Sequence, residues 1–240
     1  MSRISNPIEY SIADFLDRIY KPNPQNILFW DTCALLDIIR FIYRNGDLDT
    51  YKALNKINGL IQTGTLYSIA SSLTISEWNE HEENTKNSIE KSLQQTYTYH
   101  DISLKVINEI FSSTYVSEPL HDKNLVQHLI ALADNILSKT HFITTNDIAN
   151  GALERVRDKR PPASKKNEFK DSTIWETILK LSREIYSFDK EKIQIFYTVN
   201  TDDFIDKSRN PKVFYASLIA EASSSNLICC QNTNEIVTKI

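Results

Sequence analysis

The sequence predicts an α/β fold of three layers (α/β/α), in which helices cover both faces of a central parallel sheet. Short, wholly apolar segments recur along the chain, and segments with helical spacing of apolar residues separate them. Apolar runs of this kind are typical of strands buried on both faces, and their alternation with helices indicates parallel strands joined by crossover helices. A helical block in the middle of the chain extends this predicted fold.

The first part of the chain predicts two strands of the sheet. The predicted elements are a helix over residues 8–20, a strand over 27–30, helices over 33–44 and 48–62, and a strand over 66–70. The helices carry apolar residues every three or four positions, whereas the strands are uninterrupted apolar runs. Asn45-Gly46-Asp47 is a turn signal between the second helix and the third.

The middle of the chain is almost entirely helical by the same criterion. Residues 74–112 predict two or more helices, and residues 122–138 continue the helical spacing. His141–Thr144 fits either a short strand or a junction between helices. Residues 158–169 contain Pro161-Pro162 and many charged side chains, which predicts an exposed loop.

The last part of the chain returns to alternating elements. These are a helix over 171–186, a strand over 193–198, a helix over 211–222 and a short strand over 227–229. Only four glycines and seven prolines occur, and no low-complexity segment offers a linker between domains. We therefore expect a single domain over residues 1–240, with a helical insertion and a basic loop over 84–160 inside it.

Composition excludes several classes of protein. Hydrophobic residues make up 41% and charged residues 24% of the 240 residues, which is ordinary for a soluble globular protein. No apolar run approaches the roughly 20 residues of a membrane-spanning helix, and acidic residues near the start do not fit a signal peptide. The three cysteines give no disulfide framework, so we expect a cytoplasmic protein. The net charge of −4 argues against a module that only binds nucleic acid.

Four acidic residues lie beside the ends of predicted strands. Asp31, Glu77 and Asp203 each come after a predicted strand, and Asp171 begins a predicted helix. Ligands of parallel sheets bind beyond the carboxyl ends of the strands, and carboxylate oxygens are the ligands that Mg²⁺ and Mn²⁺ prefer. A divalent cation held in this way activates water against a phosphodiester. We therefore expect these four residues to bind Mg²⁺ or Mn²⁺ and to be catalytic.

Each of these acids also has a purely structural explanation. Asp31 and Asp171 stand where helix N-caps are expected, Thr74-x-x-Glu77 matches a capping box, and Asp203 lies in a plausible turn. Capping does not explain why all four acids fall on one edge of the sheet, whereas a shared cation does. An ionised carboxylate directly after a buried apolar strand, as at Asp31, is also costly unless something pairs with it.

Some neighbours of the four acids leave alternatives open. The alternatives are Glu80, Glu82 and Glu83 beside Glu77, Asp202 beside Asp203, and Asp147 in Thr144-Thr145-Asn146-Asp147. The spacing Asn-x-x-Asp-Phe favours Asp203 over Asp202. The segment that ends at Asp147 repeats the pattern around Asp203, but Asn-Asp pairs mostly mark turns.

A basic segment precedes Asp171. Between residues 155 and 170 there are seven lysines and arginines against two acids, a local excess of five positive charges. We expect Arg160, Lys165 and Lys166 to bind the phosphates of a nucleic acid without reading its sequence; a solvated loop with no specific role is the alternative. Thr198 and Asn200 are expected to orient a ligand by hydrogen bonds, although a turn at the strand end explains them nearly as well.

The order and context of the four acids resemble those of the PIN-domain ribonucleases. Ile27–Leu35 is similar to the opening of a PIN domain, where an apolar strand leads into Asp, a small or polar residue and a helix. Glu77 matches the second acid of the family. Lys170–Glu176 resembles the third acidic motif, and Tyr197–Phe204 resembles the fourth, in which Thr or Ser and Asn precede an Asp-Phe pair. The resemblance covers roughly residues 26–230.

This resemblance implies an endoribonuclease that cleaves RNA with Mg²⁺ or Mn²⁺, often as a homodimer, and in many bacterial members a toxin paired with an antitoxin. The chain departs from the minimal pattern in its length and in the helical block between Glu77 and Asp171. A catalytically inactive PIN-like RNA-binding or scaffold protein is the main alternative, and the intact set of four acids argues against it. A haloacid-type phosphatase would need Asp-x-Asp at the first strand, which Asp31-Thr32-Cys33 lacks.

Overall fold

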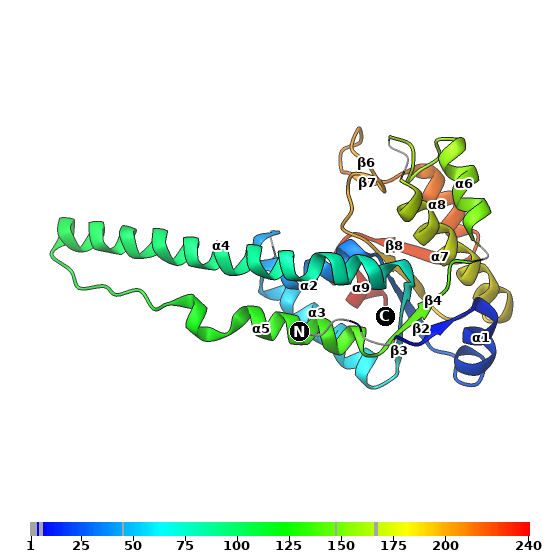
Figure 1. Ribbon diagram of the computed structural model, residues 1–240, viewed down its shortest axis with the longest axis horizontal. Coiled ribbons are helices and arrows are strands. Elements are labelled where there is room, and N and C mark those ends of the chain that lie inside the picture. Colours follow the sequence, from blue (N-terminus) through cyan, green and yellow to red (C-terminus); the bar gives the residue numbers. More distant parts are fainter. Residues whose placement is uncertain (1–3, 5–6, 45, 147, 166–167) are drawn as a thin grey trace.

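A six-stranded parallel sheet forms the centre of the structure, a computed structural model that describes residues 4, 7–44, 46–146, 148–165 and 168–240 (Figure 1). The strands are β1 (Glu9–Tyr10), β2 (Asn26–Trp30), β3 (Leu66–Ser71), β4 (Thr140–Ile143), β5 (Gln194–Tyr197) and β8 (Leu227–Cys230). Their order is β1-β4-β3-β2-β5-β8, and every neighbouring pair is parallel. The predicted parallel sheet is confirmed.

Strand β2 lies in the middle of the sheet, and the chain changes direction across the sheet beside it. From β2 the chain proceeds outwards through β3 to β4, and it then returns to place β5 on the other side of β2. Where strand order reverses in this way, the connections at the carboxyl ends diverge and leave a crevice for ligands. The acids predicted after β2, β3 and β5 are therefore carried by three adjacent strands.

Two helical layers cover the sheet, as predicted. One layer contains α2 (Thr32–Arg40), α3 (Leu48–Gln62), α5 (Leu125–Leu137), α9 (Thr233–Lys239) and part of α4, and the other contains α1 (Ile12–Phe15), α7 (Phe169–Phe188) and α8 (Ala216–Ser223). Side chains of β2 alternate between the layers: Leu28 and Trp30 belong to the first core, and Ile27 and Phe29 belong to the second. Burial on both faces explains the uninterrupted apolar run of β2.

Some predicted elements differ from the structure. The helix expected over 8–20 begins only at Ile12, where Ser11 caps it, and Glu9–Tyr10 form the edge strand β1 instead. The helix expected over 211–222 is shortened to α8, because an antiparallel pair, β6 (Ile205–Asp206) and β7 (Val213–Phe214), precedes it. The open alternative at His141–Thr144 is resolved as strand β4, which lies between β1 and β3.

The helices expected over 74–112 are one continuous helix, α4 (Leu73–Phe111), of 39 residues. No glycine or proline lies in this segment, so nothing in its sequence forces a break. The first half of α4 packs against α2 and α5 through Trp78, Ile89 and Leu93. Its second half projects away from the sheet, and the chain returns beneath it to α5 (Figure 1). In the described part of the chain, no helix combines the length and apolar character needed to cross a membrane.

Candidate active site

The structure brings the four predicted acids to the same edge of the sheet. Asp31 directly follows β2, Glu77 lies in the second turn of α4, Asp171 in the first turn of α7, and Asp203 in the loop after β5. The negative charges of Asp31, Asp203 and Glu77 all act on Asp171 and raise its pKa, so the four carboxylates share one electrostatic environment. We call these four residues the acid cluster.

Asp31 is the most buried member of the acid cluster, with 1% of its surface exposed. It stands at the N-cap position of α2, but its side chain makes no capping hydrogen bond there. The Thr198 hydroxyl donates to Asp31 Oδ2 at 2.6 Å instead. Burial raises the pKa of Asp31 to about 6; the hydrogen bond from Thr198 lowers this pKa, and the charge of Glu77 raises it.

Asp171 lies inside the first turn of α7, whose N-cap position is taken by Glu168. The capping explanation for Asp171 is therefore wrong. Burial, together with the charges of Asp31 and Asp203, raises its pKa to about 8. A carboxyl group is perturbed in this direction when it is taken out of water among like charges.

Glu77 is held at the cluster by two contacts. The Thr32 hydroxyl donates to Glu77 Oε2 at 2.6 Å, and Lys170 Nζ lies 3.5 Å from Glu77 Oε1. The predicted capping box is not formed, because the N-cap of α4 is Ser72 rather than Thr74. The competing glutamates lie elsewhere: Glu80 and Glu83 are exposed, and Glu82 is buried beside Asp134.

Asp203 has one carboxylate oxygen without a partner among the described residues. The residue is 7% exposed, and its Oδ1 is buried with no hydrogen bond from that part of the chain. Asn200 builds the turn that places it, because Asn200 Oδ1 accepts from the backbone N–H groups of Asp202 (3.2 Å) and Asp203 (3.3 Å). Asp202, the alternative, is exposed and forms an ion pair with Lys207.

Thr198 and Asn200 thus lie where they position two acids. The Thr198 hydroxyl donates to Asp31 and also accepts a hydrogen bond from the Asn200 backbone N–H at 2.9 Å. The turn at the end of β5 is made by the same groups that contact Asp31 and Asp203, and a role of Thr198 and Asn200 toward a ligand stays a prediction. In the other open segment, the Thr144 N–H donates to the Tyr10 carbonyl, and Asp147 lies outside the described residues.

The basic segment is less available to a ligand than its composition predicts. Arg155 is 1% exposed and is bound to Glu176 and Glu221. Arg157 forms an ion pair with Asp158, and the Arg160 guanidinium lies 3.8 Å from Glu221. The prediction of an exposed loop is also only partly correct, because Pro162 and Ala163 are buried. Glu176 and Glu221 from neighbouring helices therefore balance part of the predicted local excess of positive charge.

Two lysines nevertheless lie beside the acid cluster. Lys165 donates to the Asp202 carbonyl at 3.2 Å, and its ammonium group lies 5.7 Å from the centre of the Tyr215 ring. Lys170, which contacts Glu77, was not predicted to bind anything; its place directly before Asp171 was the available signal. Lys166 lies outside the described residues.

The acid cluster fits a divalent cation chemically, although it does not form a closed coordination shell. In the described residues no group of three or more His, Cys, Asp or Glu side chains is arranged as a finished metal site. Thr198, Thr32 and Lys170 bind oxygens of Asp31 and Glu77. The unpartnered Asp203 Oδ1 and the raised pKa values of Asp31 and Asp171 indicate a deficit of positive charge. An all-oxygen donor set of this kind suits Mg²⁺ or Mn²⁺.

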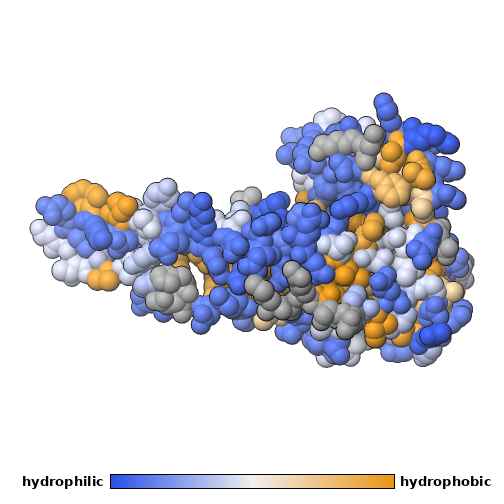
Figure 2. All heavy atoms as spheres, in the orientation of Figure 1, coloured by the Kyte–Doolittle hydropathy of each residue, from blue (hydrophilic) through white to orange (hydrophobic). Residues whose placement is uncertain are grey.

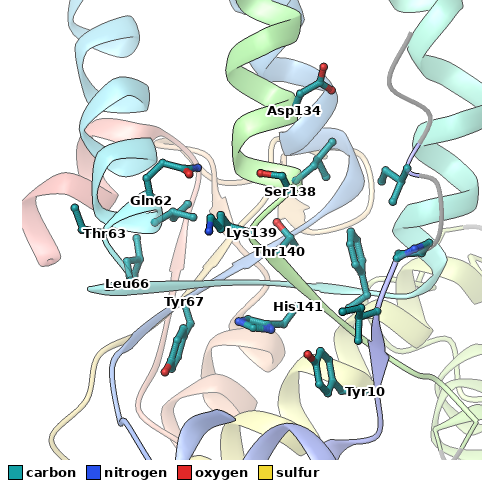
Figure 3. A pocket seen from close by; sticks show the side chains of 17 residues that line it. Tyr10, Gln62, Thr63, Leu66, Tyr67, Asp134, Ser138, Lys139, Thr140 and His141 are labelled. Atoms are coloured by element: carbon teal, nitrogen blue, oxygen red, sulfur yellow. The ribbon is translucent and has the colours of Figure 1, made fainter. Parts of the chain in front are cut away.

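A cavity of about 720 Å³ lies at the other end of the sheet (Figure 3). Leu66 and Thr140, the first residues of β3 and β4, line it together with Tyr10, Tyr67 and His141. None of the four acids lines this cavity. Because the carboxylates gather at the carboxyl ends of the strands, the cavity is a separate feature from the acid cluster.

Comparison with known proteins agrees with this geometry. A family model described as a PIN domain matches residues 28–204, a span that contains all four acids. No curated protein and no solved structure matches the chain significantly. PIN domains are generally nucleases, which bind nucleic acid and usually use divalent metal ions. With its parallel sheet, its three layers and its match over most of the sequence, the chain belongs to the PIN domain family.

Proposed function

We propose that this protein is an endoribonuclease that hydrolyses RNA phosphodiester bonds with Mg²⁺ or Mn²⁺. The observation that carries this proposal is the acid cluster, in which burial and mutual repulsion raise the pKa of Asp31 to about 6 and of Asp171 to about 8. A protein that only binds RNA gains nothing from like charges held together at this cost. Perturbed acids grouped at a switch point of the sheet are typical of a catalytic centre.

Each member of the proposed site has a role that follows from its position. Asp31, Glu77, Asp171 and Asp203 would hold the cation, which when bound supplies a more acidic water and charge stabilisation at the phosphate. Thr198 fixes the orientation of Asp31 through its 2.6 Å hydrogen bond. Asn200 fixes Asp203 through the turn that it closes. Hydrogen bonds of this kind to metal-binding carboxylates orient them for binding.

The RNA backbone would pass over the lysines beside the acid cluster. Lys165 and Lys170 present ammonium groups next to Asp203 and Glu77 respectively. Lys170 offsets part of the cluster charge, and a bound cation would free it to contact a phosphate. Arg160 and Lys166 would extend this path. Such contacts bind phosphates of any sequence.

Cleavage of single-stranded RNA by the full chain tests the proposal. We expect cleavage with Mg²⁺ or Mn²⁺, loss of cleavage with EDTA, and its return when the metal is added in excess. Asp31→Asn should reduce the rate by at least about 100-fold, since partners of metal ligands alone contribute about 10- to 100-fold. Glu77→Gln removes another proposed cation ligand. Its matched control is Glu80→Gln, because Glu80 is exposed on the same helix.

Two results would contradict the proposal. One is cleavage that is equally fast in EDTA. The other is RNA binding without any cleavage in Mn²⁺, which would instead support an inactive PIN-like binding protein. The role of a toxin with an antitoxin partner, which the family resemblance implies, further requires that expression of the parent chain arrests bacterial growth while Asp31→Asn does not.

A further inference from the structure

A second pocket, of about 310 Å³, lies at the carboxyl edge of the sheet, as does the acid cluster. The segments that follow β5 and β8 contribute to its lining, and so do α2 and the turn after α2. We call it the edge pocket and define it by six of its lining residues: Asp37, Phe41, Arg44, Thr198, Thr201 and Thr233. Thr198 joins the edge pocket to the acid cluster, because its hydroxyl donates to Asp31 Oδ2 at 2.6 Å.

The edge pocket is lined mainly by side chains that can form hydrogen bonds. Nine of its twelve lining residues have such a side chain. Figure 2 shows a different surface at the far end of α4, where hydrophobic residues gather. The volume of the edge pocket is at the lower limit of pockets that bind small molecules. Its size and lining therefore suit one small polar ligand.

Two buried oxygen atoms of the edge pocket have no hydrogen-bond partner among the described residues. They are Asp37 Oδ1 and Thr233 Oγ1, and Thr233 is only 2% exposed. Arg44 Nε lies 3.6 Å from Asp37 Oδ1, a distance that makes an ion pair but is too long for a hydrogen bond. Buried polar atoms of folded proteins are nearly always hydrogen-bonded. Two unpartnered atoms in one pocket therefore indicate a site for a polar ligand.

Asp37 and Arg44 place hydrogen-bond acceptors next to hydrogen-bond donors. The carboxylate of Asp37 has two acceptor oxygens, and the guanidinium of Arg44 has donors alone. Their ion pair keeps the two groups side by side. Burial raises the pKa of Asp37, whereas the charges of Arg44 and Arg40 lower it and favour the ionised carboxylate. A ligand that matches this pair has two adjacent donors beside one acceptor.

We propose that the edge pocket binds a guanine base of the RNA, within a few nucleotides of the bond that is cleaved. The choice of RNA as the ligand rests on the proposed function. Guanine carries two donors, N1–H and the N2 amino group, beside the acceptor O6. A carboxylate accepts from both donors and an adjacent guanidinium donates to O6, so Asp37 and Arg44 match this edge of the base in order.

The other three bases do not match the pair. Adenine and cytosine each place an acceptor nitrogen of the ring beside a single amino group, and uracil places its single N–H between two carbonyl groups. Each of them therefore turns an acceptor toward the Asp37 carboxylate, and such repulsion gives a site its selectivity. A good bidentate contact discriminates between bases by about 5- to 150-fold, so we expect a preference of about 10-fold for guanine.

The position of the edge pocket places the guanine near the scissile bond. Asp37 comes six residues after Asp31, which corresponds to about 9 Å along α2. A nucleic-acid strand rises roughly 3.4 Å for each phosphate, so about two or three nucleotides span this distance. Phe41 supplies an aromatic ring on which a base can stack, and this ring is itself stacked on Tyr51 at 6.1 Å.

Binding of RNA in EDTA tests the edge pocket without any need for cleavage. The probes are short, labelled, single-stranded oligonucleotides of uridine with and without one central guanosine, and fluorescence anisotropy measures their affinity for the full chain. We expect the guanosine probe to bind about 10-fold more tightly. Asp37→Asn should reduce this difference to about twofold or less, because an amide replaces one acceptor with a donor. Arg44→Met, at an exposed side chain, should reduce it as well.

Asp17→Asn is the matched control, because Asp17 is an exposed aspartate that pairs with Lys21 and does not line the edge pocket. This variant should keep the full preference for the guanosine probe. A parent chain that binds the two probes equally would overturn the proposal. A preference that both Asp37→Asn and Arg44→Met retain would overturn it too.

Mapping of the cleavage sites in RNA of random sequence tests the place of the guanine. With Mn²⁺, guanine should be enriched at one fixed position within about three nucleotides of the cut, and Asp37→Asn should remove this enrichment. Cuts without an excess of guanine would overturn the proposal. A chain that does not cleave at all contradicts the proposed function, and the binding measurement in EDTA then decides whether the edge pocket recognises guanine.

Discussion

The protein holds two groups of buried charge that differ in balance. In one, the Arg155 side chain donates to Glu176 (2.6 and 2.8 Å), to Glu221 (2.8 Å) and to the Pro161 carbonyl (2.5 Å). Trp175 donates to Glu221 as well. We call this group the Arg155 network. The other group is the acid cluster, where the described residues supply one lysine contact, from Lys170 to Glu77 at 3.5 Å.

The difference separates a structural ion cluster from a candidate catalytic one. In the Arg155 network each nitrogen of the buried guanidinium has an oxygen partner. The network joins α6 (Ala149–Arg157), α7 and α8. Its consequence is that Pro161 is held beside α7 and α8. In the acid cluster the like charges raise the pKa of Asp171, and Asp203 Oδ1 has no hydrogen-bond partner among the described residues. Charge that the fold leaves uncompensated is charge that a ligand can compensate.

The largest effect is expected when the balanced network is broken. Arg155→Met should lower the free energy of unfolding by about 3–5 kcal/mol, because Glu176 and Glu221 keep their buried charge without the guanidinium. Urea unfolding followed by circular dichroism measures this loss. Arg157→Met is the control, since its ion pair with Asp158 is on the surface and its removal should change stability by less than about 1 kcal/mol.

A change in the unbalanced cluster should affect catalysis rather than stability. Asp203→Asn should reduce RNA cleavage by at least about 100-fold, because it removes a proposed cation ligand. Asp202→Asn, one residue away, should cleave at nearly the parental rate, since Asp202 is exposed and paired with Lys207. Both proteins should unfold at or above the parental temperature. Equal cleavage rates for the two variants would show that Asp203 is not the fourth acid of the site.

The stability of the metal-free protein should fall as pH rises from about 4 to 8. Asp31 and Asp171 have folded pKa values of about 6 and about 8, above the ordinary value of about 4. The folded state therefore binds more protons than the unfolded state in this range, and stability that is present at low pH is lost on deprotonation. Unfolding at pH 5.5 and pH 8 should differ by at least about 1 kcal/mol. Asp171→Asn should reduce the difference, and Mn²⁺ should stabilise the parent most at pH 8.

The smallest effect concerns the lysines. Lys165→Ala should weaken RNA binding for all sequences and reduce the slope of affinity against salt by about 1, because one phosphate contact is lost. Neutralising Lys166 as well should reduce it by about 2 in total. Titrations at several salt concentrations measure the slope. Lys91→Ala, exposed on α4, is the control, and the same slope for both single variants would remove Lys165 from the RNA path.

The comparison also shows what sequence can predict. Asp31 was identified because it follows an apolar run, and that run is apolar because β2 is buried on both faces. The Arg155 network was missed, since its partners lie 21 and 66 residues further along the chain and only the packing of α6, α7 and α8 brings them together. From composition alone, Arg155 counts as one more positive charge of the basic segment, although its side chain is buried.

The single helix α4 was missed for a different physical reason. The buried apolar residues up to Leu93 lie on one face, and beyond Tyr99 a second apolar face, with Val106 and Ile110, lies roughly 80–140° away around the helix. Sequence patterns treat such a change of phase as the start of a new helix, because they assume that one apolar face packs on one core. The projection gives the second face a different environment, which the sequence alone does not reveal.

The same helix, α4, is anchored to the rest of the protein through its first part. Buried side chains from Thr74 to Leu93 fix its first part against the protein, whereas the second part projects and contacts the returning chain. A force on the projecting part of α4 would bend that part and scarcely displace the part that is packed against the protein. Glu77 lies in the fixed part, about 50 Å along the helix from Ile110. Bending of the projecting part should therefore leave Glu77 in its place within the acid cluster.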